Sequence, residues 1–144
     1  MHSEVTVRSR PGAAYTTEID AGNHAWLVDE PEDAGDDLGP NPYDLLLAAL
    51  GSCTTMTLQV YARRKGWPLE SSTIRLRHER CTQPSDDGRS TIRWEEIRRE
   101  IELTGPLDDE QRVRLLEIAS RCPIHRTIVG DLRVIDELVV PVGA

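Results

Sequence analysis

The strongest nucleophiles in this 144-residue chain are the thiols of three cysteines, Cys53, Cys81 and Cys122. An odd and small number of cysteines is too few for a disulfide scaffold and is typical of thiol chemistry in a reducing compartment. Cys81 stands near a predicted hairpin among polar residues, and we interpret it as a bystander thiol. Cys53 and Cys122 are therefore the two candidates for chemistry.

Cys53 lies in the middle of a long apolar segment that we predict to be helical. A free cysteine in such a place often only fills core space. Four hydroxyl side chains surround it in the sequence, and this indicates the wall of a pocket; they are Ser52, Thr54, Thr55 and Thr57. A structural role and a reactive role both stay open on these residues alone.

Cys122 directly precedes Pro123, which is favoured at the first position of a helix. If a helix begins there, Cys122 is its N-cap, and the helix dipole favours a thiolate. His125 and two neighbouring arginines add positive charge nearby. A buried cysteine that merely ends a loop is the equally open alternative.

The pair Cys122 and His125 has a spacing found in metal sites, and Cys53 could join them from a distance. A structural zinc site normally needs four ligands, and the sequence has no second cysteine or histidine pair with ligand spacing. The sequence also lacks a glycine-rich phosphate loop and a Gly-x-Ser-x-Gly motif. We therefore expect neither a metal nor a cofactor.

Length and composition predict one domain over residues 1–144, with an aliphatic core, since aromatic residues make up 4% and phenylalanine is absent. The net charge of −8 argues against nucleic acid as a partner. The longest strongly apolar run, Leu45 to Gly51, is too short to cross a bilayer, and the N-terminus does not resemble a signal peptide. We therefore expect a cytoplasmic protein without membrane contact.

The elements that must position the cysteines begin with a three-stranded meander, predicted from alternating residues and turn signals. An acidic loop, predicted to be solvated, covers Glu30–Asp37. A helix then starts at Pro42, capped by Asn41 with Asp44 in its first turn, and Gly66 ends it. The meander strands are predicted at Ser3–Ser9, Ala14–Asp20 and His24–Asp29.

The second half of the chain is predicted to add a hairpin, two helices and a last strand. The first half of the Cys53 helix is apolar on every side, so we expect it to be buried all round, with a second subunit supplying part of its cover. The fold class is α+β. The predicted elements are strands Ser72–Glu79 and Thr91–Leu103, helices Asp108–Arg121 and Pro123–Val129, and a strand through Val134–Val139.

Two motifs together resemble the OsmC/Ohr family of osmotically inducible and organic-hydroperoxide-resistance proteins. The first runs from Gly39-Pro40-Asn41-Pro42 through Leu50-Gly51-Ser52-Cys53, and the second, 69 residues after Cys53, is Arg121-Cys122-Pro123-Ile124-His125. The resemblance covers nearly the whole chain. The Cys-Pro-x-His form is closer to the general OsmC-like branch than to the Ohr branch.

The resemblance implies an intertwined homodimer in which antiparallel sheets surround a buried cysteine helix, with sites at the subunit interface. It implies a thiol peroxidase that reduces organic hydroperoxides in oxidative or osmotic stress defence, with hydrogen peroxide as a second candidate substrate. Cys53 would be the peroxidatic thiol and Cys122 the resolving thiol, joined in a disulfide that an external dithiol of lipoyl or thioredoxin type reduces. No metal or prosthetic group is implied.

This chain departs from the family at one position, because Tyr43 stands where well-characterised members have a glutamate, with Asp44 one position on. In the family that glutamate orients an arginine that lowers the pKa of the peroxidatic cysteine. Arg8 or Arg10 could supply the arginine here, and His125 is a further supporting candidate. The departure motivates an alternative function, a small-molecule or lipid-like ligand-binding protein, or a redox sensor, with little peroxidase activity.

Overall fold

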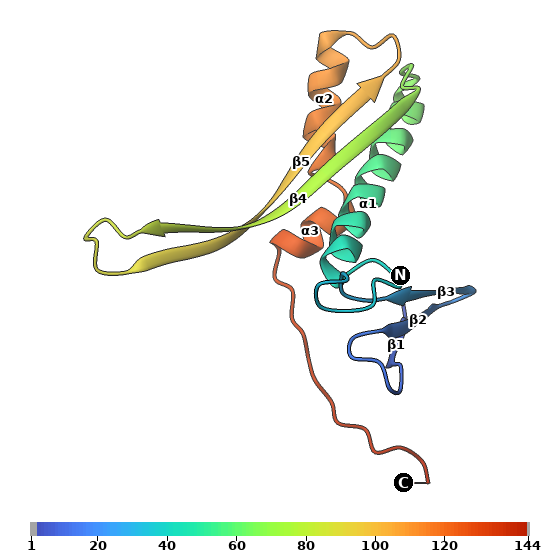
Figure 1. Ribbon diagram of the computed structural model, residues 1–144. Coiled ribbons are helices and arrows are strands. Elements are labelled where there is room, and N and C mark those ends of the chain that lie inside the picture. Colours follow the sequence, from blue (N-terminus) through green and yellow to red (C-terminus); the bar gives the residue numbers. More distant parts are fainter. Residues whose placement is uncertain (1–2, 144) are drawn as a thin grey trace. The chain divides into compact units, whose positions relative to one another are not determined.

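A computed structural model describes residues 3–143 and arranges their helices and strands in two compact units (Figure 1). The first unit comprises the described residues up to Ser52 together with Ile74–Glu100, and the second comprises Cys53–Thr73 together with the described residues from Ile101 on. Helices and antiparallel strands occur together, so the predicted α+β class is confirmed. One domain over residues 1–144 stays a prediction.

The N-terminal sheet is the predicted meander, with β1 (Thr6–Ser9), β2 (Thr17–Ala21) and β3 (His24–Val28) in that order and antiparallel. Ile19 lies between Val7 and Trp26 in the strand register and is buried. The first two strands begin later than predicted. Their alternation of apolar and polar residues nevertheless places Ile19 on the covered face.

The acidic loop is held at its base by Asp29, whose side chain is only 2% exposed. This carboxylate accepts hydrogen bonds from the Thr16 hydroxyl and from the backbone N–H groups of Glu30 and Leu38. Burial raises the pKa of Asp29, but these hydrogen bonds lower it by more, so its pKa lies below the ordinary value. Most of Glu30–Asp37 is exposed, as predicted, and Asp29 is its buried anchor.

The cysteine helix α1 (Pro42–Lys65) begins and ends where the sequence predicts. The Asn41 side chain accepts from the Asp44 N–H at 2.9 Å, and the Asp44 carboxylate accepts from the Asn41 N–H at 3.1 Å. This reciprocal capping satisfies two N–H groups at the helix start. Gly66 has a φ of +65°, a conformation that glycine adopts without strain, and it ends the helix.

The prediction that α1 is buried all round is not met within one chain, since only 28% of its most apolar stretch is buried. Met56 and Val60, for example, are 65% and 45% exposed. By length and composition alone this helix could cross a membrane, with a mean hydropathy of 1.4 over 18 residues. The uninterrupted apolar run Leu45 to Gly51 is too short to indicate a membrane-spanning length. The full helix reaches that length because further apolar residues follow, interspersed with polar ones.

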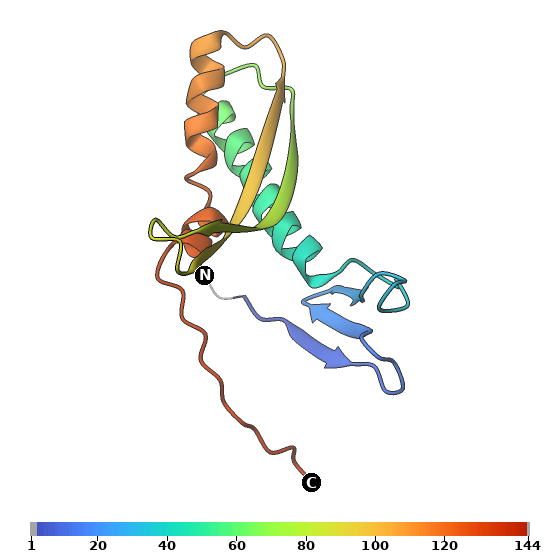
Figure 2. The same ribbon diagram turned by 60° about the vertical axis from the view of Figure 1, so that its left-hand side comes forward.

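The hairpin β4 (Ser71–Pro84) and β5 (Thr91–Thr104) forms a two-stranded sheet (Figures 1 and 2), and both strands extend beyond their predicted ends. Gly51 allows a close approach in the first unit, because a Cβ atom there would lie 2.8 Å from the Leu76 side chain. In the second unit the Thr55 and Ser72 hydroxyls are 2.6 Å apart. Both contacts fasten the helix to β4.

The second unit is completed by α2 (Asp109–Ala119) and α3 (Pro123–Val129), with ends close to the predicted ones. Asp108 and Gln111 form a capping box at the start of α2. The core of this unit is aliphatic, as the composition predicts. Its buried aliphatic residues are Leu58, Ala62, Leu107, Leu115, Ile118 and Ala119.

The predicted last strand is wrong for the single chain, because the described residues after α3 contain neither helix nor strand (Figure 1). Ile135 is 81% exposed and Leu138 is 97% exposed. The residues have strand-like composition, but a strand forms only where a neighbouring strand offers backbone hydrogen bonds. This segment finds no such neighbour within its own unit.

Candidate functional site

The two candidate thiols meet in the second unit, where the side chains of Cys53 and Cys122 lie close enough to interact. Cys53 lies midway along α1 and is half-buried, whereas Cys122 is 0% exposed. Both are free thiols. Two cysteines that are 69 residues apart in the sequence are thus direct neighbours in the fold.

Cys122 is the N-cap of α3, as the Cys-Pro sequence predicts. Its backbone is extended, and its sulfur accepts a hydrogen bond from the backbone N–H of His125 at 3.2 Å. Pro123 occupies the start of the helix, where its missing N–H costs nothing. The backbone of His125 therefore takes part in holding Cys122; a role for its side chain stays a prediction.

Burial raises the pKa of the Cys53 thiol, and the neighbouring side chain of Cys122 raises it further. The backbone N–H of Ile124 and the Thr57 hydroxyl act in the opposite direction, but the net pKa is above the ordinary value for cysteine. Within the second unit, Cys53 is therefore mainly a neutral thiol at neutral pH.

The hydroxyl residues around Cys53 are engaged in packing and hydrogen bonds. Thr57 donates to the Cys53 carbonyl oxygen at 2.8 Å, Thr55 contacts Ser72, and Thr54 is fully buried. Ser52 donates to the Ala49 carbonyl oxygen at 3.2 Å and is exposed. These hydroxyl groups mainly form hydrogen bonds to helix carbonyl oxygens and to β4, so they position the Cys53 thiol indirectly, by fixing the backbone of the helix.

The raised pKa of Cys53 predicts a steep pH dependence of its alkylation. Because only the thiolate reacts, the rate with iodoacetamide is expected to rise about tenfold per pH unit between pH 7 and pH 9 and to stay below that of an unfolded cysteine. Peptide mass spectrometry after quenching at each pH gives the rate at Cys53 alone. A rate that is already constant at pH 7 would show a low pKa and contradict this expectation.

The two candidate arginines of the N-terminal sheet each have a carboxylate partner on β2. Arg8 pairs with Asp20, and the Arg10 Nε lies 3.1 Å from a Glu18 oxygen. All four side chains are more than one third exposed. These contacts do not distinguish one arginine from the other as an activator of Cys53.

Tyr43, at the position of the family glutamate, belongs to a cluster in the first unit that the sequence did not reveal. Its ring stacks on His78 with centroids 4.4 Å apart, and its hydroxyl accepts a hydrogen bond from Arg80 at 3.3 Å. This bond and Glu95 raise the pKa of Arg80. His78 and Arg80 alternate with other charged residues along β4, so no local signal sets them apart.

The Asp44 carboxylate caps α1 by accepting a hydrogen bond from the Asn41 N–H, and this bond does not connect it to the Tyr43 cluster. It does line, with Tyr43, Leu47, His78 and Arg80, a surface cavity of about 530 Å³. The cavity combines flat rings with a guanidinium. Of the sequence-predicted supporting residues, Tyr43 and Asp44 are therefore neighbours at the start of α1.

Comparison with known proteins agrees with this arrangement. A family profile described as OsmC-like protein matches residues 35–135. A hydroperoxide reductase of Mycoplasma genitalium is 32% identical over 93 residues, which are 64% of this chain and 64% of that protein. The match thus spans less than two thirds of the curated relative.

Solved structures share the fold at lower identity. An OsmC-like protein from Mycoplasma pneumoniae superposes with a TM-score of 0.71 at 20% identity, covering 91% of this chain and 89% of the other. An organic hydroperoxide resistance protein OsmC from Legionella pneumophila gives 0.67 at 15% identity, covering 92% of each chain. With the profile spanning both Cys53 and Cys122, these matches establish that the chain belongs to the OsmC-like protein family.

Proposed function

We propose that this protein is a cysteine-based peroxidase that reduces organic hydroperoxides, with Cys53 as the peroxidatic and Cys122 as the resolving residue. The observation that carries the proposal is the contact between a half-buried and a fully buried thiol in a chain of this family. The similarity to a hydroperoxide reductase of Mycoplasma genitalium supports the same reaction class.

The reaction begins when the Cys53 thiolate attacks one oxygen of the peroxide bond. The O–O bond breaks, Cys53 becomes a sulfenic acid, and the leaving alkoxide takes a proton to become an alcohol. Cys122 then attacks the Cys53 sulfur, a disulfide forms, and water leaves. An external dithiol, of lipoyl or thioredoxin type, restores both thiols and is itself oxidised to a disulfide. The cycle needs no metal or prosthetic group.

The raised pKa of Cys53 means that a positive group must approach this thiol for a fast reaction at neutral pH. Arg8, Arg10 and Arg80 are the candidates. Arg80 differs from the other two because the residue at the family glutamate position, Tyr43, binds it directly. Each arginine is replaced by methionine, and the rate of Cys53 alkylation is measured as a function of pH. The activating arginine is the one whose replacement shifts the rise in rate furthest to high pH.

The proposed function is tested by adding one equivalent of cumene hydroperoxide to the reduced protein. We expect rapid loss of two thiols and a Cys53–Cys122 disulfide on peptide mapping, with Cys81 still reduced. Persistence of both thiols in excess peroxide would refute the peroxidase. Saturable binding of an apolar ligand would then favour the alternative, a ligand-binding protein of the same fold.

A homodimer is the oligomeric state that this proposal includes. The exposed apolar side of α1 and the exposed apolar residues after α3 give one chain more apolar surface than a soluble monomer usually shows. A second copy offers both an apolar helix and unpaired strand edges to cover them. Light scattering at micromolar concentration is expected to give twice the chain mass of 16.2 kDa; the mass of one chain would contradict the dimer.

Cytoplasmic location and the absence of nucleic acid and membrane partners stay predictions from composition. They accord with the reducing environment that the free thiols need.

A further inference from the structure

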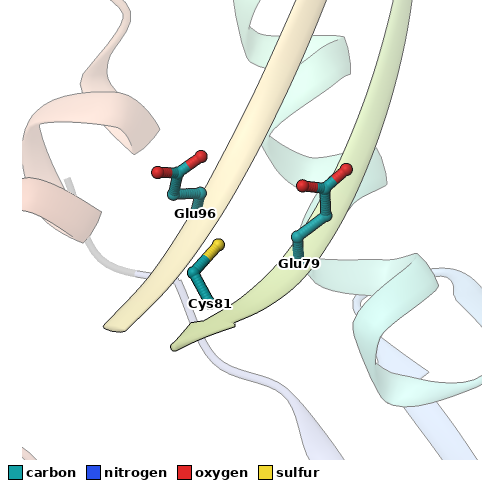
Figure 3. A group of neighbouring side chains, drawn as sticks. All are labelled: Glu79, Cys81 and Glu96. Carbon is teal, nitrogen blue, oxygen red and sulfur yellow. The ribbon is translucent and has the colours of Figure 1, made fainter. Parts of the chain in front are cut away.

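The third cysteine, Cys81, has no part in the proposed peroxidase cycle, yet it lies in a group of metal-binding side chains. Its sulfur and one carboxylate oxygen each from Glu79 and Glu96 all lie within 4.8 Å of one another. Figure 3 shows the Cys81 thiol pointing toward the space between the two carboxylates. All three residues belong to the first unit.

The three side chains come from two paired strands, which fixes their backbone positions. Glu79 and Cys81 are two residues apart on β4 and share one face, and Glu96 reaches them from the neighbouring strand β5. The Trp94 indole N–H donates to Glu96 at 2.8 Å and orients that carboxylate. Outer hydrogen bonds of this kind are typical of carboxylates that bind metals.

The two carboxylates already share a positive charge. The Arg98 guanidinium lies 3.6 Å from a Glu79 oxygen and 3.4 Å from a Glu96 oxygen. Both distances are longer than those of a tight charged hydrogen bond. The arginine side chain is 61% exposed, so a compact divalent cation can replace it between the same oxygens.

We propose that Cys81, Glu79 and Glu96 form a binding site for a Zn²⁺ ion. One thiolate and two carboxylates are ligands that zinc accepts, and three protein ligands leave the fourth tetrahedral position to water. With zinc bonds of about 2.0–2.3 Å, tetrahedral ligand atoms lie roughly 3.5 Å apart. The Glu79 side chain is 43% exposed and can turn inward by the ångström or so that this requires.

Zinc can reach the thiol, because Cys81 and Trp94 line a surface cavity of about 400 Å³. Zinc binds cysteine as the thiolate, so its binding displaces the proton of the Cys81 thiol. Arg98 competes for the same oxygens, so its removal is expected to tighten binding.

The test is titration of the reduced full-length protein with Zn²⁺ against a chromophoric chelator, together with Co²⁺ as a spectroscopic probe. We expect one zinc per chain and a thiolate-to-cobalt charge-transfer band. Cys81→Ser is expected to abolish the band and weaken zinc binding about tenfold or more, and Glu79→Gln to weaken it by a similar factor. Arg98→Met is expected to strengthen it.

Two matched controls separate this site from others. Cys53→Ser is expected to keep the band, because it removes the thiol of the proposed peroxidase but leaves Cys81. Glu100→Gln removes an exposed carboxylate of β5 that pairs with Arg77 and is not one of the three proposed ligands. This variant is expected to bind zinc as the unaltered chain does. Loss of the band in Cys53→Ser but not in Cys81→Ser would overturn the proposal, as would the absence of zinc binding to the reduced protein.

Discussion

Replacement of Cys53 by serine is expected to reduce the turnover of cumene hydroperoxide, with dithiothreitol as reductant, by about a thousandfold or more. The serine hydroxyl is not ionised at neutral pH and cannot form a sulfenic acid, so the first step of the proposed cycle is lost. Peroxide consumption at a fixed protein concentration measures the effect.

The matched control is Cys81→Ser, assayed without added metal. It also removes one half-buried thiol, but one that lies on the hairpin, and it is expected to retain the activity of the unaltered protein. Unchanged turnover in Cys53→Ser would refute the assignment of Cys53. An equal loss in both variants would point to damage to the fold, which circular dichroism of each variant detects.

The second large effect is expected from Cys122→Ser, which keeps the first chemical step and removes the second. One equivalent of peroxide is expected to be consumed at least as fast as by the unaltered protein, because Cys122 no longer raises the pKa of Cys53. The Cys53 sulfenic acid is expected to accumulate, because no buried thiol remains to resolve it. Dimedone labelling at Cys53 measures that intermediate. Repeated turnover is expected to fall roughly tenfold or more, as the sulfenic acid is oxidised further.

This variant is well suited to the question because serine is itself a favoured helix N-cap. A serine oxygen can accept the hydrogen bond that the Cys122 sulfur now receives from His125, so α3 is expected to keep its start. If Cys122→Ser instead formed a Cys53–Cys81 disulfide and turned over at the normal rate, Cys122 would not be the required resolving thiol.

The sequence predicts most of the fold because local signals agree with the final structure. The caps at Asn41 and Asp108, the glycine after α1 and the proline of α3 are all properties of a few neighbouring residues. The position of Cys122 as an N-cap follows from the Cys-Pro dipeptide in the same way. The proximity of Cys53 and Cys122 could be predicted only from the tertiary structure or the family resemblance.

What the sequence did not predict depends on contacts between distant residues. Asp29 is one of several acids in a row, and its burial depends on hydrogen bonds that include one from Thr16, thirteen residues away. Arg80 and His78 become notable through Tyr43, which is more than thirty residues away in the chain. Cys81, interpreted as a bystander, gains Glu96 as a neighbour through strand pairing, beside Glu79 of its own strand. The strand predicted at Val134–Val139 failed for the same reason, since pairing is not a local property.

The unequal burial of the two thiols has a consequence for the direction of electron flow. Cys122 is fully enclosed while Cys53 is half-buried, so a reductant that meets a Cys53–Cys122 disulfide on this chain can approach the Cys53 sulfur more easily. The mixed disulfide then forms on Cys53, and Cys122 is the leaving group. The N–H of His125, which points at the Cys122 sulfur, stabilises the departing negative charge. In the proposed cycle, the cap that begins α3 thus makes the buried sulfur the better leaving group, and Cys53 is expected to receive both the oxidant and the reductant.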